Sequence, residues 1–306
     1  MAINYAEQYQ KELDQLLTQE ALSSELETQN VNWMGAKTFH VPHVAVSGYK
    51  PHSRNGGFNR GTVNVDFEPY TLKFDRDIEF FVDKADVDET DQAASAANVT
   101  GIFMREHGIP EMDAYRFSKL AQRAVADKNE ITDPLDRGNI YAELKKALLP
   151  MRKYGPANLT AYLSSEAMDL LERSEDFNRK IEVTNNDQTI ETRVTQLDGV
   201  RLKEVWDEQR LYTEYDFSDG FVPHEADPKD ENDADAKKIN FLIVARPAVI
   251  AKAKITSMYL FEPGQHTEGD GYLYQNRLYH DLFVMNHKQD PVFVATGGVD
   301  GGGVEG

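Results

Sequence analysis

Clustered carboxylates are the first side chains in this sequence that could do chemistry, because carboxylate oxygens are the ligands that Ca²⁺ prefers. One run consists of Asp83, Asp86, Asp88, Glu89 and Asp91. A calcium loop of the EF-hand type has acids at alternating positions and a glycine at its sharp turn, and this run has neither. Acids at the start of a helix, where they favour the positive end of the helix dipole, explain the run better.

Two other segments could bind a metal ion. Residues 227–235 are rich in acids and have the composition of a charged surface loop, with a weak cation site as the alternative. His40 and His43 lie close together, but no carboxylate is near them in the sequence. The chain has no cysteine, which removes thiolate ligands, disulfides and cysteine nucleophiles. We therefore expect no metal site and no cofactor.

No sequence motif for catalysis is present. The glycine-rich segment 55–61 lacks the Lys-Ser/Thr pair of a phosphate-binding loop, and no helix is predicted after it. A nucleophile elbow, a zinc-protease HExxH pair and a dinucleotide fingerprint are also missing. We therefore predict that the protein is not an enzyme and has no catalytic residues, which favours a structural role.

The charge balance excludes further classes of function. The 306 residues include 52 acidic and 33 basic side chains, a formal net charge of −19 at pH 7. Such a surface is not suited to coating nucleic acid, because phosphate binding needs clustered cations. No apolar run approaches the roughly 18 residues of a membrane helix, and the first residues lack the basic and apolar regions of a signal peptide.

One segment departs from this acidic character. Between Glu27 and Asp66 there is no acid. The same segment contains a set of cations and histidines, namely Lys37, Lys50, Arg54, Arg60, His40, His43 and His52. It is either a solvated loop or a basic arm that docks on an acidic surface of another copy of the chain, because opposite potentials steer and register such contacts.

Two elements near the N-terminus could form contacts between subunits. Residues 2–17 place Tyr5, Tyr9, Leu13 and Leu16 at helical spacing, which predicts either a packed terminal helix or an arm lying on a neighbour. Residues 36–74 alternate in hydrophobicity on two legs, with an interruption at Pro42 and a turn at residues 55–57. This pattern predicts a projecting hairpin, whose contact candidates are Lys50, His52, Arg54, Phe58 and Arg60.

The rest of the chain predicts one α+β body. The segment from Glu89 to Asp127 has the strongest helical periodicity, with a break at Gly108 and Pro110 in the first turn of the second helix. Further helices are expected at 139–154 and 165–174. Strands are expected at 158–163, 192–206 (paired around Asp198-Gly199), 239–244, 252–261 and 272–284.

Several segments resemble, in order, the major capsid proteins of tailed bacteriophages. They are DRDIEFFVDKADVDET from Asp75, REHGIPEMDAYRFSKLA from Arg105, YDFSDGF from Tyr215, KKINFLIVARPAVI from Lys237 and DGYLYQNRLYHDLFV from Asp270. The resemblance extends from Gly35 to about Val294 and implies the Hong Kong 97-type fold.

This resemblance implies a division of the chain into parts. They are an N-terminal arm (1–34), an extended loop (35–74), a peripheral domain with a spine helix (75–130), an axial domain (131–250), strands returning to the peripheral domain (251–297) and a flexible glycine-rich tail (298–306). The basic hairpin would be the extended loop, which in the family lies over an adjacent subunit.

The resemblance also implies a function. Pentamers and hexamers of the chain would form an icosahedral shell around double-stranded DNA, in a virion assembled in the host bacterial cytoplasm. The implied partners are the chain itself, a portal, a decoration protein and the packaged DNA, contacted weakly and without specificity; no membrane is expected. Because the fold begins almost at Met1, a scaffolding protein would be a separate chain or absent.

Three alternatives to a phage capsid stay open on the sequence alone: an encapsulin-like nanocompartment shell of the same fold, a metal-dependent hydrolase that uses the acidic clusters, and a tail or decoration protein. Some family members also crosslink a loop lysine to an asparagine of a neighbour. Lys50 is suitably placed for this, but neither its asparagine nor its assisting glutamate can be assigned, and an ordinary ion pair is the simpler expectation.

Overall fold

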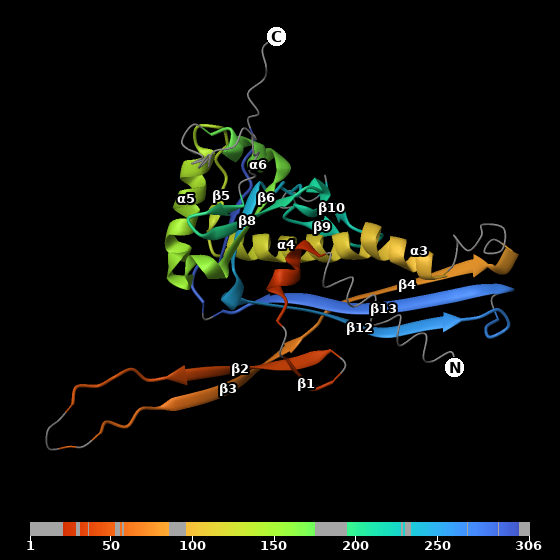
Figure 1. Ribbon diagram of the computed structural model, residues 1–306, viewed down its shortest axis with the longest axis horizontal. Helices are drawn as coiled ribbons and strands as arrows, with labels where there is room; N and C mark the ends of the chain where they lie inside the picture. The colour runs from red at the N-terminus through yellow and green to blue at the C-terminus, as the bar shows by residue number, and fades with distance from the viewer. Residues whose placement is uncertain are drawn as a thin grey trace, which may run out of the picture.

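The computed structural model describes residues 21–28, 31–35, 37–52, 56, 58–85, 96–174, 195–227, 229, 234–267, 269–286 and 288–299. Some predicted features lie outside these residues, namely the helix at 2–17 with Tyr5, Tyr9, Leu13 and Leu16, the cation Arg54, the acids from Asp86 to Asp91 and the tail after Val299. In the described part, two sheets pack on one long helix and a hairpin projects from them (Figure 1).

The first sheet has six strands in the order β5-β14-β11-β6-β8-β7. Their bounds are β5 Glu130–Ile131, β14 Val292–Ala295, β11 Phe241–Ala245, β6 Leu159–Ser164, β8 Val200–Val205 and β7 Gln196–Leu197. The central strands β11 and β6 are buried along their whole length, which confirms the strands predicted at 239–244 and 158–163. The turn between β7 and β8 has positive φ at Asp198 (51°) and Gly199 (81°), which is the turn that twists two strands into a tight hairpin.

Helices cover both faces of this sheet. Alternate residues of a strand point to opposite faces, so Phe241 and Ile243 pack with α5 (Ile140–Met151) and α6 (Ser165–Glu172). Leu242 and Val244 pack instead against α4 (Ile109–Ala126) on the other face. Ser164 caps the start of α6, since its hydroxyl accepts a hydrogen bond from the Ala167 amide at 3.2 Å.

The second sheet has three long antiparallel strands in the order β12-β13-β4. Their bounds are β12 Val249–Phe261, β13 Gly271–Val284 and β4 Phe74–Asp83. Burial alternates along β4. Phe74 and every second residue after it face the helices and are partly buried, whereas Asp75 and every second residue after it face solvent. The segment predicted as one group of final strands, 251–297, therefore contributes both to this sheet and, through β14, to the six-stranded one.

The predicted break at Gly108 is wrong. The helix α3 (Ala96–Phe103) continues through a π-helical turn, η2 (Met104–Gly108), directly into α4, and the Ile109 amide donates to the Met104 carbonyl. The reason is Pro110, which lacks an N–H and whose ring would meet the carbonyl of residue 106 in a regular α-helix. The wider π turn carries the helix past the proline without ending it.

The hairpin forms a third sheet of order β1-β2-β3, with β1 Asn32–Trp33, β2 Thr38–Val46 and β3 Val63–Thr71. The predicted interruption at Pro42 is wrong, because β2 is continuous. The Ser47 amide donates to the Thr62 carbonyl, so the amides of the odd-numbered residues of β2 are directed toward β3. The backbone nitrogen of Pro42, an even-numbered residue, is therefore directed toward the outer edge. That edge is paired to β1 only at Phe39 and His40, so a missing N–H costs no ladder hydrogen bond at Pro42.

The remaining described elements are short: the 3₁₀ helices η1 (Leu22–Leu26), η3 (Arg152–Tyr154), η4 (Pro156–Asn158), η5 (Glu208–Arg210) and η6 (Arg246–Ala248), and the strand pair β9 (Tyr215–Asp216) and β10 (Val222–Pro223). Among the described residues, no helix is long and apolar enough to cross a membrane.

Candidate functional site

The base of the hairpin is fixed to the body. Phe39 is fully buried and packs with Tyr70 and Phe283, at ring-centroid distances of 5.9 and 6.3 Å. The Lys37 ammonium pairs with Asp75 on β4 at 3.1 Å, and the Lys73 amide donates to the Asp281 carboxylate at 3.1 Å. These contacts hold the hairpin at a set angle to the long sheet while its distal part extends away from it (Figure 1).

The contact candidates predicted at the tip are exposed in the structure. Lys50, His52, Phe58 and Arg60 all lie at the surface, and the Phe58 side chain is 99% exposed. The two legs contact each other there, since Lys50 Nζ donates to the Arg60 carbonyl at 3.3 Å and Asn59 Nδ2 donates to the Pro51 carbonyl at 2.8 Å. Between the two legs lies an open hollow of about 730 Å³.

A set of exposed apolar side chains next to the tip was not predicted as a site. The register pairs Val44 with Val65 and Val46 with Val63, which places them on one face of the ribbon. We call the apolar stripe the exposed members of this face, Val44, Val46, Val63, Val65 and Phe67, which are 51–70% exposed. A two-stranded ribbon is marginal in water, and a contiguous apolar surface of this kind indicates a contact with another molecule.

The opposite electrostatic character is found on the long sheet. The solvent-facing residues of β4 include the acids Asp75, Asp77, Glu79 and Asp83, which we call the acidic stripe. Hydrogen bonds from Arg277 and Lys37 lower the pKa of Asp75 to about 2. Lys37 belongs to the acid-free segment, so the base of the hairpin already pairs with this stripe within one chain.

The residues considered for metal binding do not come together. Within the described ranges, no group of three or more histidine and acidic side chains is arranged to hold a metal ion. In the acidic segment 227–235, the Asp227 and Asp235 carboxylates accept hydrogen bonds from the amides of Lys229 and Ala226. His40 lies on β2 with its ring 6.5 Å from that of Phe67.

Comparison with known proteins gives the fold of this chain. No protein-family model matches the sequence, and no curated protein matches it. Among solved structures, the chain is similar to "Capsid structure of the Cyanophage P-SCSP1u", with a TM-score of 0.56 and 14% identity over 91% of this chain and 88% of that chain.

Two further structures are similar at a slightly lower TM-score. The "Asymmetric unit of bacteriophage PhiM1 mature capsid" has a TM-score of 0.51 and 13% identity, covering 89% of this chain and 83% of that one. A structure of Microbacterium phage Oxtober96 has a TM-score of 0.51 and 11% identity, covering 90% of this chain and 91% of that one. The chain therefore has the α+β fold of phage capsid subunits, and the predicted resemblance is confirmed at the level of the fold.

Proposed function

We propose that this protein is the major capsid protein of a tailed bacteriophage, with the Hong Kong 97-type fold. The observation that carries the proposal is the likeness to a phage capsid structure over 91% of this chain and 88% of the other. In this role the subunits associate as pentamers and hexamers, which close into an icosahedral shell around double-stranded DNA. The role is structural rather than enzymatic, and the protein resides in the virion after assembly in the host cytoplasm.

The hairpin is the contact that links subunits in this proposal. Its base is rigid, while the apolar stripe and the cations of its tip face solvent in the single chain. Burial of apolar surface contributes about 25 cal/mol per Å², so docking the apolar stripe on a second copy would supply the driving force. A contact between different surfaces of identical subunits closes into rings when the rotation between them allows it.

The acidic stripe of a second copy is the partner surface that the charges favour. It has the sign opposite to the hairpin tip, and the Lys37–Asp75 pair already joins the same two segments within the chain. Complementary potentials of this kind set the register of a contact and suppress wrong ones. The N-terminal arm, with Tyr5, Tyr9, Leu13 and Leu16, would supply a second intersubunit contact.

Further partners follow from the proposed role. A shell that is filled and emptied through one vertex needs a portal, and a separate scaffolding protein and a decoration protein are consistent with it. The net charge of −19 fits a container whose wall repels DNA, so that the packaged DNA is contacted weakly and moves freely.

A charge exchange tests the proposal. The wild-type chain, alone or with its phage's scaffolding protein, is expected to form closed shells or capsomers in negative-stain microscopy and light scattering. Lys50→Glu combined with Arg60→Glu should prevent this without unfolding the subunit, because both side chains are exposed. Adding Asp77→Lys and Glu79→Lys should restore assembly, because the charges then match again.

The matched control reverses two cations elsewhere. Lys146→Glu on α5 with Arg173→Glu after α6 changes the net charge equally at exposed ion pairs, which contribute little to stability, and should leave assembly intact. Assembly by the hairpin variant at wild-type level would contradict docking through its charges. Failure of the fourfold variant, with the hairpin variant also inactive, would contradict the acidic stripe as the partner surface.

A further inference from the structure

Residues 21–28, which we call the strap, lie across the junction of the two sheets. Ala21 is buried in the hydrophobic cluster that Met104 and Met112 form with the long sheet. Leu26, five residues further on, is buried in the cluster in which α4 packs with Leu242 of the six-stranded sheet and with Ala251 of the long sheet. One short segment therefore contributes side chains to two clusters, one of which contains residues of both sheets, and it forms a single bridge to β12 between Glu27 and Ala251.

A buried carboxylate on α4 holds the start of the strap. Asp113 is fully buried and accepts hydrogen bonds from the Leu22 amide (3.0 Å), the Ser23 amide (3.1 Å) and the Ser23 hydroxyl (2.5 Å). The first amides of a helix have no partner within it, and Ala21 offers no capping side chain. Asp113 thus caps η1 from a helix ninety residues away in the sequence.

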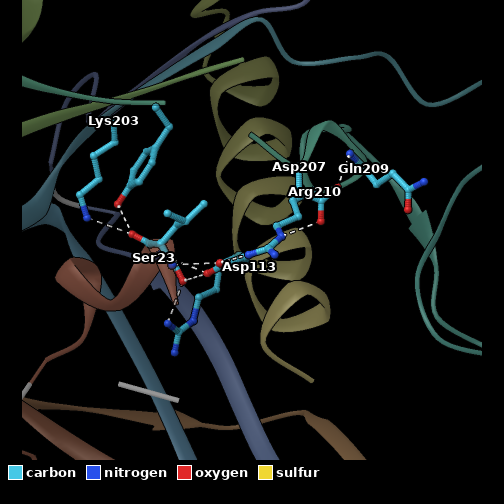
Figure 2. A network of polar contacts seen from close by, with 9 residues as sticks. Ser23, Asp113, Lys203, Asp207, Gln209 and Arg210 are labelled. Carbon is cyan, nitrogen blue, oxygen red and sulfur yellow. Dashed lines mark hydrogen bonds and ion pairs between the residues drawn. The ribbon is translucent and has the colours of Figure 1, made fainter. Parts of the chain in front are cut away.

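The same carboxylate reaches a third element. Arg210 of η5, on the segment that follows β8, contacts Asp113 through Nη1 at 3.2 Å (Figure 2). Arg210 is in turn paired with Asp207 at 2.9 Å. The Asp113 carboxylate therefore joins the strap, the long helix and the edge of the six-stranded body at one point.

The rest of the strap is held from both sides. Arg116, also fully buried, donates to the Ser23 hydroxyl at 3.0 Å and pairs with Glu27 at 2.7 Å. On the side of the six-stranded sheet, Glu25 pairs with Arg201 and with Lys203 of β8. On the side of the long sheet, the Thr28 amide donates to the Ala251 carbonyl of β12 at 3.0 Å.

We propose that the strap is a lock that holds the two sheets at one mutual angle, and that Asp113 is the residue that positions it. Desolvation offsets much of the attraction between buried charges, so such groups add little net stability. The directional bonds to both oxygens of Asp113 instead favour one geometry, although Arg116 Nε has no partner among the described residues. The strap bonds to α4, β8 and β12 at once. Releasing it loosens the junction at which the two sheets share one hydrophobic cluster around α4 and widens the range of angles between the sheets. This inference goes beyond the proposed function and does not depend on it.

The test uses Asp113→Asn in the full chain. An amide has one acceptor oxygen and adds donors that face the Leu22 and Ser23 amides, so the amides of residues 22–28 should exchange with solvent deuterium at least about ten times faster. Amides of β6, β11 and β13 should keep their protection. Asp169→Asn on α6 is the matched control, since it breaks an exposed ion pair with Arg173, just after that helix, and should change neither region.

The angle itself is measured between spin labels. The chain has no cysteine, so spin labels attach only to cysteines that are introduced. Lys146→Cys on α5 and Tyr259→Cys on β12, both at exposed positions, place one label beside each sheet. We expect one narrow distance distribution in the labelled wild type and a broader one after Asp113→Asn. Ser23→Ala, which removes one hydrogen bond from Asp113 and one from Arg116, should give a smaller change in the same direction.

Two results would overturn the proposal. One is unchanged exchange of residues 22–28 in Asp113→Asn, or an unchanged distance distribution once those amides exchange faster. The other is loss of protection throughout the chain in both Asp113→Asn and Ser23→Ala, since the network would then support the whole fold and not the angle between the sheets.

Discussion

The His280 side chain on β13 is fully buried among aromatic rings, with centroids 4.8 Å from Phe74 and 5.1 Å from Tyr115. Burial, together with the nearby Arg116 and Arg76 guanidinium groups, lowers the pKa of His280 well below its usual value of 6.5. Its Nδ1 atom has no hydrogen-bond partner among the described residues. The imidazole is therefore neutral in the folded protein and becomes protonated more readily in the unfolded chain.

This residue predicts an acid-sensitive subunit. Because the folded pKa is depressed, the contribution of neutral His280 to stability is complete above pH 6.5 and is lost as the pH falls from there toward the folded pKa. The loss approaches about 1.4 kcal/mol for each pH unit within that window. His280→Phe removes the titrating group and should flatten the dependence of the unfolding free energy on pH between pH 6.5 and 5, measured by urea unfolding with circular dichroism.

The control is His52→Asn at the exposed hairpin tip, which should leave the dependence unchanged. An equal slope in His280→Phe and the wild type would show that other groups set the acid sensitivity.

At the scale of elements, we expect changes in the apolar stripe of the hairpin to weaken assembly without weakening the fold of the subunit. Val44→Ser combined with Val65→Ser, a cross-strand pair in the apolar stripe, should change the stability of the isolated subunit by less than about 0.5 kcal/mol, because both side chains are exposed. A buried valine contributes about 1.5 kcal/mol or more. Light scattering should therefore show the concentration needed for assembly rising by roughly tenfold or more.

Asn64→Ser lies on the same strand but on the other face of the ribbon, and it should assemble as the wild type does. Equal assembly of the valine variant and the Asn64→Ser control would exclude the apolar stripe from the subunit contact.

The sequence predicted the strands of the hairpin, but not which of their faces is exposed. Alternation of Val63, Val65 and Phe67 was enough to predict a strand, but it could not say which face stays free. That depends on the packing of Phe39 and Tyr70 against Phe283, more than two hundred residues away in the sequence. The sequence pattern also failed at Pro42, which was taken as an interruption although the open edge of β2 accommodates it. It failed again at Gly108, where a break was predicted although a π turn continues the helix.

The structure of the strap could not be predicted from the sequence either. Residues 21–28 have little periodicity, and their structure depends on Asp113 and Arg116 of α4 and on Lys203 of β8. A polar network formed between distant segments has no local sequence signal. In contrast, β11, β12, β13, α5 and α6 were predicted close to their observed bounds, because a continuous apolar run or a helical stripe is a local property.

At the scale of the whole molecule, we expect the hairpin to complete its contacts on another subunit. The single chain leaves an apolar stripe and a cationic tip facing solvent, while Phe39 and the Lys37–Asp75 pair attach the base of the hairpin to the body. It also carries an acidic stripe on β4 that a second hairpin would match. Both surfaces belong to a fold shared with phage capsid structures.

The most direct test of this claim is cryo-electron microscopy of the assembled particles, at a resolution that traces the hairpin. Residues 38–71 of each subunit are expected to lie on an adjacent subunit, with the apolar stripe buried and the tip cations beside Asp77 and Glu79 of that neighbour. Particles in which the hairpin contacts only its own subunit or solvent would contradict this claim.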